Sequence, residues 1–98
     1  MNCHMQVLNR TLLRSNQEIA EVSIELSGDK RNFKNINPGE AIQTKFENIP
    51  ESHFVLQGRL KDGTRFQGDF GYLTPGFNYN NVFIVNLGGE IEFETTIK

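Results

Sequence analysis

The chain contains little of what most enzymes need. Its 98 residues include no tryptophan, a single cysteine and two histidines. One cysteine cannot form an internal disulfide, which is consistent with a reducing compartment. The N-terminal residues lack the charged and apolar regions of a signal peptide, and no apolar run reaches the ~20 residues of a membrane span. We therefore expect a cytoplasmic protein that does not enter a membrane.

Positive charge is not in surplus either. The chain carries 10 Lys and Arg against 12 Asp and Glu, a net charge of −2. Nucleic-acid binding requires cations that neutralise phosphates, so we do not expect nucleic acid as a partner. The last third is more acidic than the rest, and this favours a cationic partner surface. The alternative is a solvated strand face that carries glutamates for solubility.

Catalytic and metal-binding groupings are equally scarce. His4 directly follows Cys3, so on a strand their side chains would point to opposite faces and could not form a catalytic pair. A zinc site built from Cys3, His4 and His53 would lack the paired ligand spacing of structural sites. We expect no catalytic residues, no metal site and no cofactor, and hence no enzymatic activity.

Three alternating glutamates, Glu90, Glu92 and Glu94, are a separate case, because on a strand they would lie about 7 Å apart on one face. Glycosidase carboxylates usually come from different elements that line a cleft, and Ca²⁺ prefers a loop that surrounds it with oxygens. A surface that binds cationic side chains, arginine above all, fits this row better.

What the chain does have is a period of two. Apolar and polar residues alternate over short segments separated by turn signals, and eight phenylalanines are available for an aromatic core. The pattern predicts strands at about residues 3–9, 21–26, 31–36, 41–47, 54–60, 64–70, 82–87 and 90–97. Seven or eight such strands predict an all-β, single-domain antiparallel β-sandwich over residues 1–98, immunoglobulin-like but without that fold's cysteine pair or tryptophan. A curved single sheet or a small barrel is the alternative.

Two turns can be predicted from their residues. Pro38-Gly39 is typical of a type II turn, because proline fixes φ and glycine then accepts a positive φ. Lys61-Asp62-Gly63 is predicted as a three-residue loop, because only an odd loop length places Phe54, Leu56 and Leu60 on the same face as Phe66 and Phe70.

The C-terminal hairpin is the strongest local signal. Gly88-Gly89 between two β-type runs predicts a two-residue type I′ turn. That register pairs Ile84 with Phe93, and it places Val82, Ile84, Ile91 and Phe93 in the core. The opposite face would then carry Phe83, Val85 and Leu87 beside the three glutamates. The alternative is that these three apolar side chains face a second sheet or a covering loop.

Two surfaces are therefore candidate binding sites. The first combines Glu90, Glu92 and Glu94 with Phe83, and with Asp69 as a further acid. The second is the segment 71–80, in which Tyr72, Phe77 and Tyr79 accompany several asparagines, a combination that recurs in binding loops. For the second segment, the alternative is a loop that folds back over the core.

Several turn residues carry a resemblance. Ile36-Asn37-Pro38-Gly39-Glu40, Lys61-Asp62-Gly63-Thr64, Gly71-Tyr72 and Gly88-Gly89-Glu90-Ile91 resemble a group of small uncharacterised bacterial proteins with a β-sandwich fold, over roughly residues 8–94. In its acidic side and its lack of catalytic equipment the chain also resembles the immunity proteins of toxin systems such as contact-dependent growth inhibition, which share no common motif.

These observations favour a non-enzymatic protein-binding module. The most concrete form is an immunity protein that binds and blocks a cationic nuclease-type toxin. The alternative is a carbohydrate-binding or surface-adhesion sandwich. An enzyme that uses the glutamates is the third hypothesis.

Overall fold

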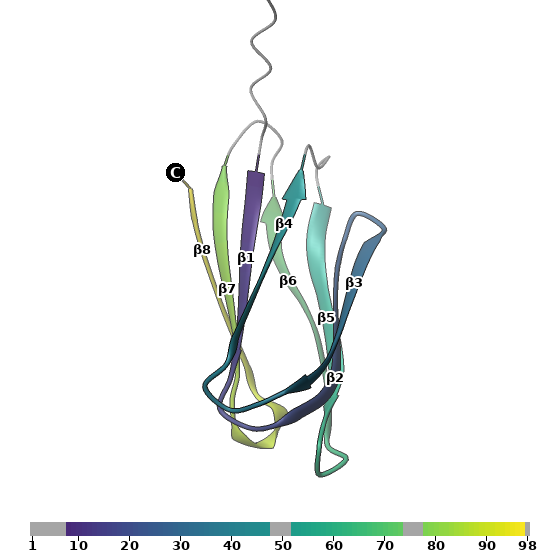
Figure 1. Cartoon of the computed structure of the whole chain (residues 1–98). Coiled ribbons are helices and arrows are strands. Elements are labelled where there is room, and N and C mark those ends of the chain that lie inside the picture. Colours follow the sequence, from purple (N-terminus) through teal and green to yellow (C-terminus); the bar gives the residue numbers. More distant parts are fainter. Residues whose placement is uncertain (1–7, 48–51, 74–77, 98) are drawn as a thin grey trace, which may run out of the picture.

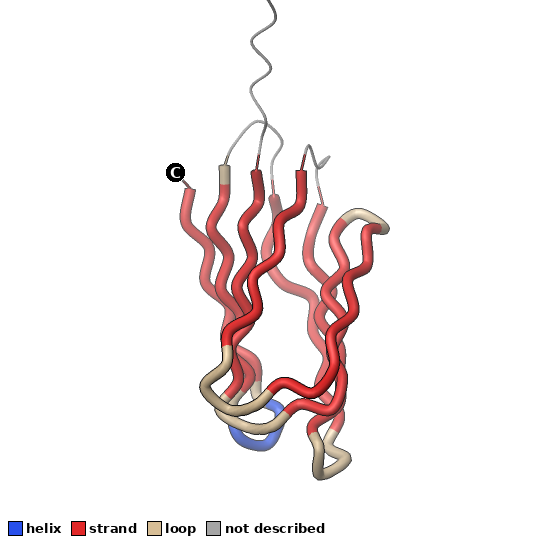
Figure 2. Tube along the Cα trace, viewed as in Figure 1, coloured by secondary structure: helices blue, strands red, loops and turns tan. Residues whose placement is uncertain are grey.

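The computed structural model describes residues 8–47, 52–73 and 78–97, and over these ranges it is a β-sandwich. Two four-stranded sheets face each other, with the chain passing from β1 to β2 and from β3 to β4 at the same end (Figures 1 and 2). The strands are β1 (Leu8–Ser15), β2 (Ile19–Leu26), β3 (Asp29–Ile36), β4 (Ala41–Glu47), β5 (Ser52–Leu60), β6 (Arg65–Leu73), β7 (Tyr79–Val85) and β8 (Ile91–Ile97). The predicted sandwich is confirmed, and the curved single sheet and the small barrel are wrong.

The strand order explains how distant segments meet. Sheet A has the order β4-β1-β7-β8 and sheet B the order β3-β2-β5-β6. Sheet B is antiparallel throughout, whereas β1 and β7 pair in parallel and make sheet A mixed. This parallel pairing departs from the expected all-antiparallel arrangement. Strands joined by a hairpin must pair antiparallel, but β1 and β7 are separated by five other strands along the chain and are free of that constraint.

Phenylalanine rings fill the space between the sheets. Phe54 of sheet B packs edge-on against Phe83 of sheet A, with 5.3 Å between ring centroids, and Phe83 lies 4.8 Å from Phe93 on the neighbouring strand. Phe46 and Phe70 extend the cluster on either side. Edge-to-face contacts of this kind add stabilisation beyond the buried area.

Both turns predicted from glycine positions are confirmed. The backbone N–H of Glu40 donates to the carbonyl of Asn37 across Pro38-Gly39, and Gly39 has a φ of 86°. In the other turn the register pairs Gly58 with Phe66 and Phe54 with Phe70, as the odd loop length requires. The backbone N–H of Thr64 donates to Asp62 Oδ1 in this loop and lowers the pKa of that carboxyl.

The C-terminal hairpin is offset by one residue from the predicted register. Leu87–Gly89 forms a three-residue 3₁₀ turn closed by the N–H of Asn86, which donates to the carbonyl of Glu90. Gly88 and Gly89 both take a positive φ, as expected, but the loop includes one residue more than a type I′ turn. Successive side chains of a strand point to opposite faces. The extra loop residue therefore exchanges the inward and outward side chains of β7 relative to those of β8.

The prediction of the core face of β7 is therefore wrong. Phe83 and Val85 are fully buried, whereas Val82 and Ile84 lie on the outer face and are half-buried. Phe83 pairs with Phe93, and Ile84 pairs with Glu92. On β8 the prediction holds, since Ile91 and Phe93 pack against the core.

The first strands also differ from the prediction. The expected strand at residues 3–9 lies largely outside the described residues. Residues 10–20, over which the sequence pattern predicts no strand, contribute to β1 and β2. Thr11 and Ser15 are buried on the inner face of β1. These inward polar residues obscure the alternation that identifies a strand.

An arginine links the two sheets at the edge formed by β3 and β4. Arg31 Nη1 donates to Thr44 Oγ1 at 2.7 Å, and its guanidinium lies 4.5 Å from the centre of the Phe46 ring. Arg31 also pairs with Asp29, and this hydrogen bond lowers the pKa of the Asp29 carboxyl. Arg31 thus belongs to the inner face of β3.

Candidate functional site

The predicted acidic surface exists, but its members are divided between the two sheets. Glu90, Glu92 and Glu94, here called the acid row, are exposed along the β8 edge of sheet A. Asp69 is exposed on β6 of sheet B, on the other side of the sandwich. Phe83 is buried in the core and cannot form part of a surface, and half-buried Val82 and Ile84 lie beside the acid row in its place.

The predicted aromatic loop is likewise not a single surface. Tyr79 begins β7 and is only 6% exposed, so it is a core residue, whereas Tyr72 on β6 is 66% exposed. Phe77 lies outside the described residues. Of the aromatic residues predicted to bind a partner, Tyr72 is the one that the structure shows at the surface.

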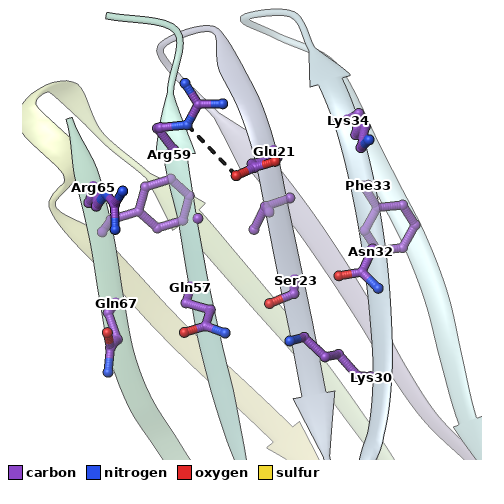
Figure 3. Close-up of a pocket in the computed structure, with 13 residues that line it drawn as sticks. Glu21, Ser23, Lys30, Asn32, Phe33, Lys34, Gln57, Arg59, Arg65 and Gln67 are labelled. Atoms are coloured by element: carbon purple, nitrogen blue, oxygen red, sulfur yellow. Dashed lines mark ion pairs between the residues drawn. The ribbon is translucent and has the colours of Figure 1, made fainter. Parts of the chain in front are cut away.

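A different site lies on the outer face of sheet B. It is a hollow of about 470 Å³ that spans all four strands of the sheet (Figure 3). We call it the polar hollow. It is lined by Glu21, Val22, Ser23, Lys30, Asn32, Phe33, Lys34, Gln57, Gly58, Arg59, Arg65, Phe66 and Gln67. Its size falls in the range of small-ligand sites.

Strand pairing arranges the outward side chains of the hollow in rows. Asn32, Ser23, Gln57 and Gln67 occupy directly paired positions on β3, β2, β5 and β6, and Figure 3 shows the last three side by side. This amide row contains no charge. Each amide offers both a donor and an acceptor, and the serine hydroxyl does the same.

A row of charged side chains runs parallel to the amide row, two residues further along each strand. Lys34, Glu21, Arg59 and Arg65 are directly paired across the sheet. Arg59 Nε lies 3.7 Å from Glu21 Oε1. None of the ion pairs among the described residues involves Lys34, Arg65 or Lys30, which lines the hollow next to the amide row. The hollow therefore has four cations and one carboxylate.

The lining of the hollow supplies polar and charged groups that can bind a ligand. Its lining contains no histidine or cysteine, and its single carboxylate is paired with Arg59. Phe33 and Phe66 alternate with the outward residues: Phe66 is buried in the core, and Phe33 is half-buried and packs against it. The chemistry on offer is a line of neutral hydrogen-bonding groups next to guanidinium and ammonium groups.

Sequence reasoning missed this site although it assigned most of the strands correctly. Alternation places Gln57 and Arg59 on one face of their strand, and Arg65 and Gln67 on one face of the next. Alternation does not show that β2 lies between β3 and β5. This strand order is what brings the outward side chains of all four strands into continuous rows. Lys30 and Lys34 lie close together in the sequence, but their link to Arg59 and Arg65 requires the strand order.

The structure also limits other chemistries over the part of the chain it describes. Within residues 8–47, 52–73 and 78–97 no group of three His, Cys, Asp or Glu side chains could hold a metal ion. None of these residues belongs to a helix that is long and apolar enough to cross a membrane. Cys3 and His4 of the rejected zinc set lie outside the described residues.

Comparison with known proteins supports the fold alone. No protein-family model matches the chain, and no curated protein matches it in sequence. A solved structure described as "NMR structure of the protein from Eubacterium rectale" superimposes with a TM-score of 0.61 at 10% identity. The match covers 91% of this chain and 86% of that one. The chain therefore shares a two-sheet β fold with this protein.

Proposed function

We propose that this protein is a non-enzymatic binding module whose ligand is an acidic saccharide held in the polar hollow. The observation that carries the proposal is the amide row next to uncompensated cations. Neighbouring sugar hydroxyls need donors and acceptors spaced along a line, and paired strands about 4.8 Å apart supply one such group per strand. Arg65 and Lys34 then offer strong, charge-assisted hydrogen bonds to a carboxylate or sulfate.

An acidic saccharide fits the hollow better than a nucleic acid does. Single-stranded nucleic acids are bound by stacking their bases on exposed aromatic side chains. The two aromatic residues that line the hollow, Phe33 and Phe66, pack with the core instead. A neutral sugar would leave the cations without a partner, and this is the reason for proposing an acidic one.

Replacing Arg65 with glutamine should weaken binding of trigalacturonate by about tenfold, because one charge-assisted contact at a partly exposed site is worth roughly 1.4 kcal/mol. Amide chemical shifts in a titration would measure this, with changes expected at Gln57 and Gln67. Lys45→Gln removes a cation from the opposite side of the sandwich and should leave the affinity unchanged.

Three outcomes would contradict the proposal. The first is that neither trigalacturonate nor a sulfated disaccharide shifts the resonances of the hollow at millimolar concentration. The second is that neutral maltotriose binds as well as trigalacturonate. The third is displacement of trigalacturonate by a short single-stranded RNA at lower concentration, which would identify the hollow as a nucleic-acid site.

A second candidate is inhibition of a basic nuclease-type toxin through the acid row. It is supported by the exposure of Glu90, Glu92 and Glu94 beside the half-buried Val82 and Ile84, since a desolvated apolar neighbour strengthens ionic contacts. In this second candidate function the protein would be an immunity protein of the contact-dependent growth inhibition type, which the sequence resembles.

Reversing the three glutamates of the acid row to lysine should abolish capture of a basic toxin domain from the native host. Comparison of proteins retained by the wild type and by this variant would test it, with Arg65→Gln as the control that leaves the acid row intact. Retention of the same proteins by both would remove the acid row as the toxin-binding surface.

A further inference from the structure

The outer face of sheet A divides into an acidic half and a basic half. Glu92 and Glu94 lie on the β8 side, whereas Arg10 and Arg14 lie on β1 and Lys45 lies on β4. All five side chains are exposed, and none takes part in an ion pair among the described residues. Arg14 is paired with Ile84, and Ile84 with Glu92, so the opposite charges stand two strands apart on the same row.

Between the two halves runs an apolar strip. Leu12 on β1 pairs directly with Val82 on β7, and Ile84 follows two residues along β7. All three are half-buried and point away from the core. A flat sheet face with an apolar centre and polar margins has the layout of a protein interface.

We propose that this face binds a second copy of the same chain, related by a twofold axis that runs parallel to the strands between β1 and β7. This operation places the β8 edge of each copy over the β1 and β4 side of the other. Glu92 and Glu94 then face Arg14, Arg10 and Lys45 of the second copy, and Leu12, Val82 and Ile84 pack against the same strip. The charges thus match twice within one symmetric interface.

The charge pattern also selects this arrangement over its alternative. A twofold axis perpendicular to the strands would stack β8 on β8 and oppose glutamate with glutamate, which is repulsive. Two sheets packed face to face are a common arrangement in β proteins. The polar hollow is on sheet B, so it stays accessible in the dimer, and the inference does not depend on its ligand.

Two charge-swap variants test the proposal. Glu92→Arg with Glu94→Arg makes the face mainly basic, and Arg10→Glu with Arg14→Glu makes it mainly acidic. Each variant alone should self-associate at least tenfold more weakly than the wild type, because like charges would face each other. An equimolar mixture of the two should recover a dimer that contains one copy of each.

Sedimentation from about 5 to about 500 µM would measure this, since a face of one small sheet is at the low end of stable interface size. Glu25→Arg with Asp69→Arg makes the same change of charge on the outer face of sheet B and should leave the dimer intact. The four swapped positions are exposed, so thermal unfolding should show that both variants fold.

The proposal is wrong if the wild type is monomeric over the whole range. It is also wrong if either swap leaves self-association unchanged, or if the two variants fail to associate with each other. Pairing of two β8 edges, the main competing arrangement, would leave self-association of the Arg10→Glu, Arg14→Glu variant unchanged, because β1 lies two strands away from that edge.

Discussion

Phe83→Ala should destabilise the fold by about 3–5 kcal/mol, a large part of the total stability of a domain of this size. Phe83 is fully buried and its ring contacts three others, Phe54 and Phe70 across the sandwich and Phe93 on the next strand. Truncation removes all three contacts and leaves a cavity that neighbouring strands cannot close without moving. Denaturant unfolding at low protein concentration would measure the loss.

The matched control is the adjacent residue. Ile84→Ala should cost no more than about 1 kcal/mol, because Ile84 is half-buried on the outer face and leaves no enclosed cavity. The comparison decides the register of the C-terminal hairpin. If Ile84→Ala were the more destabilising of the two, the two-residue Gly88-Gly89 turn would be correct and the three-residue turn wrong.

Asn81 shows why the sequence alone favours the wrong register. It is 1% exposed on the inner face of β7, where its Nδ2 donates to the carbonyl of Arg10 and its Oδ1 accepts from Thr95 Oγ1. Asn81 and its partner Thr95 are polar, so in the sequence the face of the hairpin that carries them resembles a solvent-exposed face. Val82 and Ile84 on the other face make the opposite assignment look better, and no local rule distinguishes the two.

The loop between β5 and β6 was predictable for the converse reason. Every inward residue of this hairpin is apolar or glycine, from Phe54 through Gly58 on one strand to Phe66 and Phe70 on the other. The parity of the loop then follows from the faces without ambiguity. Apart from β1, the existence of the strands, most of their boundaries and this register could therefore be predicted from alternation alone.

The polar hollow and the two-signed face of sheet A were not predictable, because both depend on which strands are neighbours. Arg59 and Lys34 are 25 positions apart in the chain, yet both pair with Glu21. Arg14 and Glu92 belong to the same row only because β1 and β7 pair in parallel. Alternation gives the face of each residue within its own strand, and long-range pairing gives its partners.

Gly58→Ala should be the second most damaging substitution, at about 2–3 kcal/mol, because it adds a group where the core has no room. A Cβ on Gly58 would lie 2.5 Å from the backbone carbonyl oxygen of Glu21 and 2.6 Å from Cζ of Phe66. The carbonyl belongs to the central strand β2, next to the irregularity between Ile19 and Glu21, so relief requires the strand to shift. Denaturant unfolding would measure the cost.

Gly28→Ala supplies the control, since a Cβ there has open space and meets only the cost of a φ of 82°, about 1 kcal/mol. Adding Phe66→Leu to Gly58→Ala separates the two contacts. We expect only partial recovery relative to Phe66→Leu alone, because the clash with the Glu21 carbonyl remains. Full recovery would mean that the ring alone determines the cost. If the double variant recovers no stability, the clash with the Glu21 carbonyl determines the cost and β2 is displaced. Displacement of β2 would also move Glu21 and Ser23. Gly58→Ala should then weaken trigalacturonate binding at the polar hollow even where the domain stays folded.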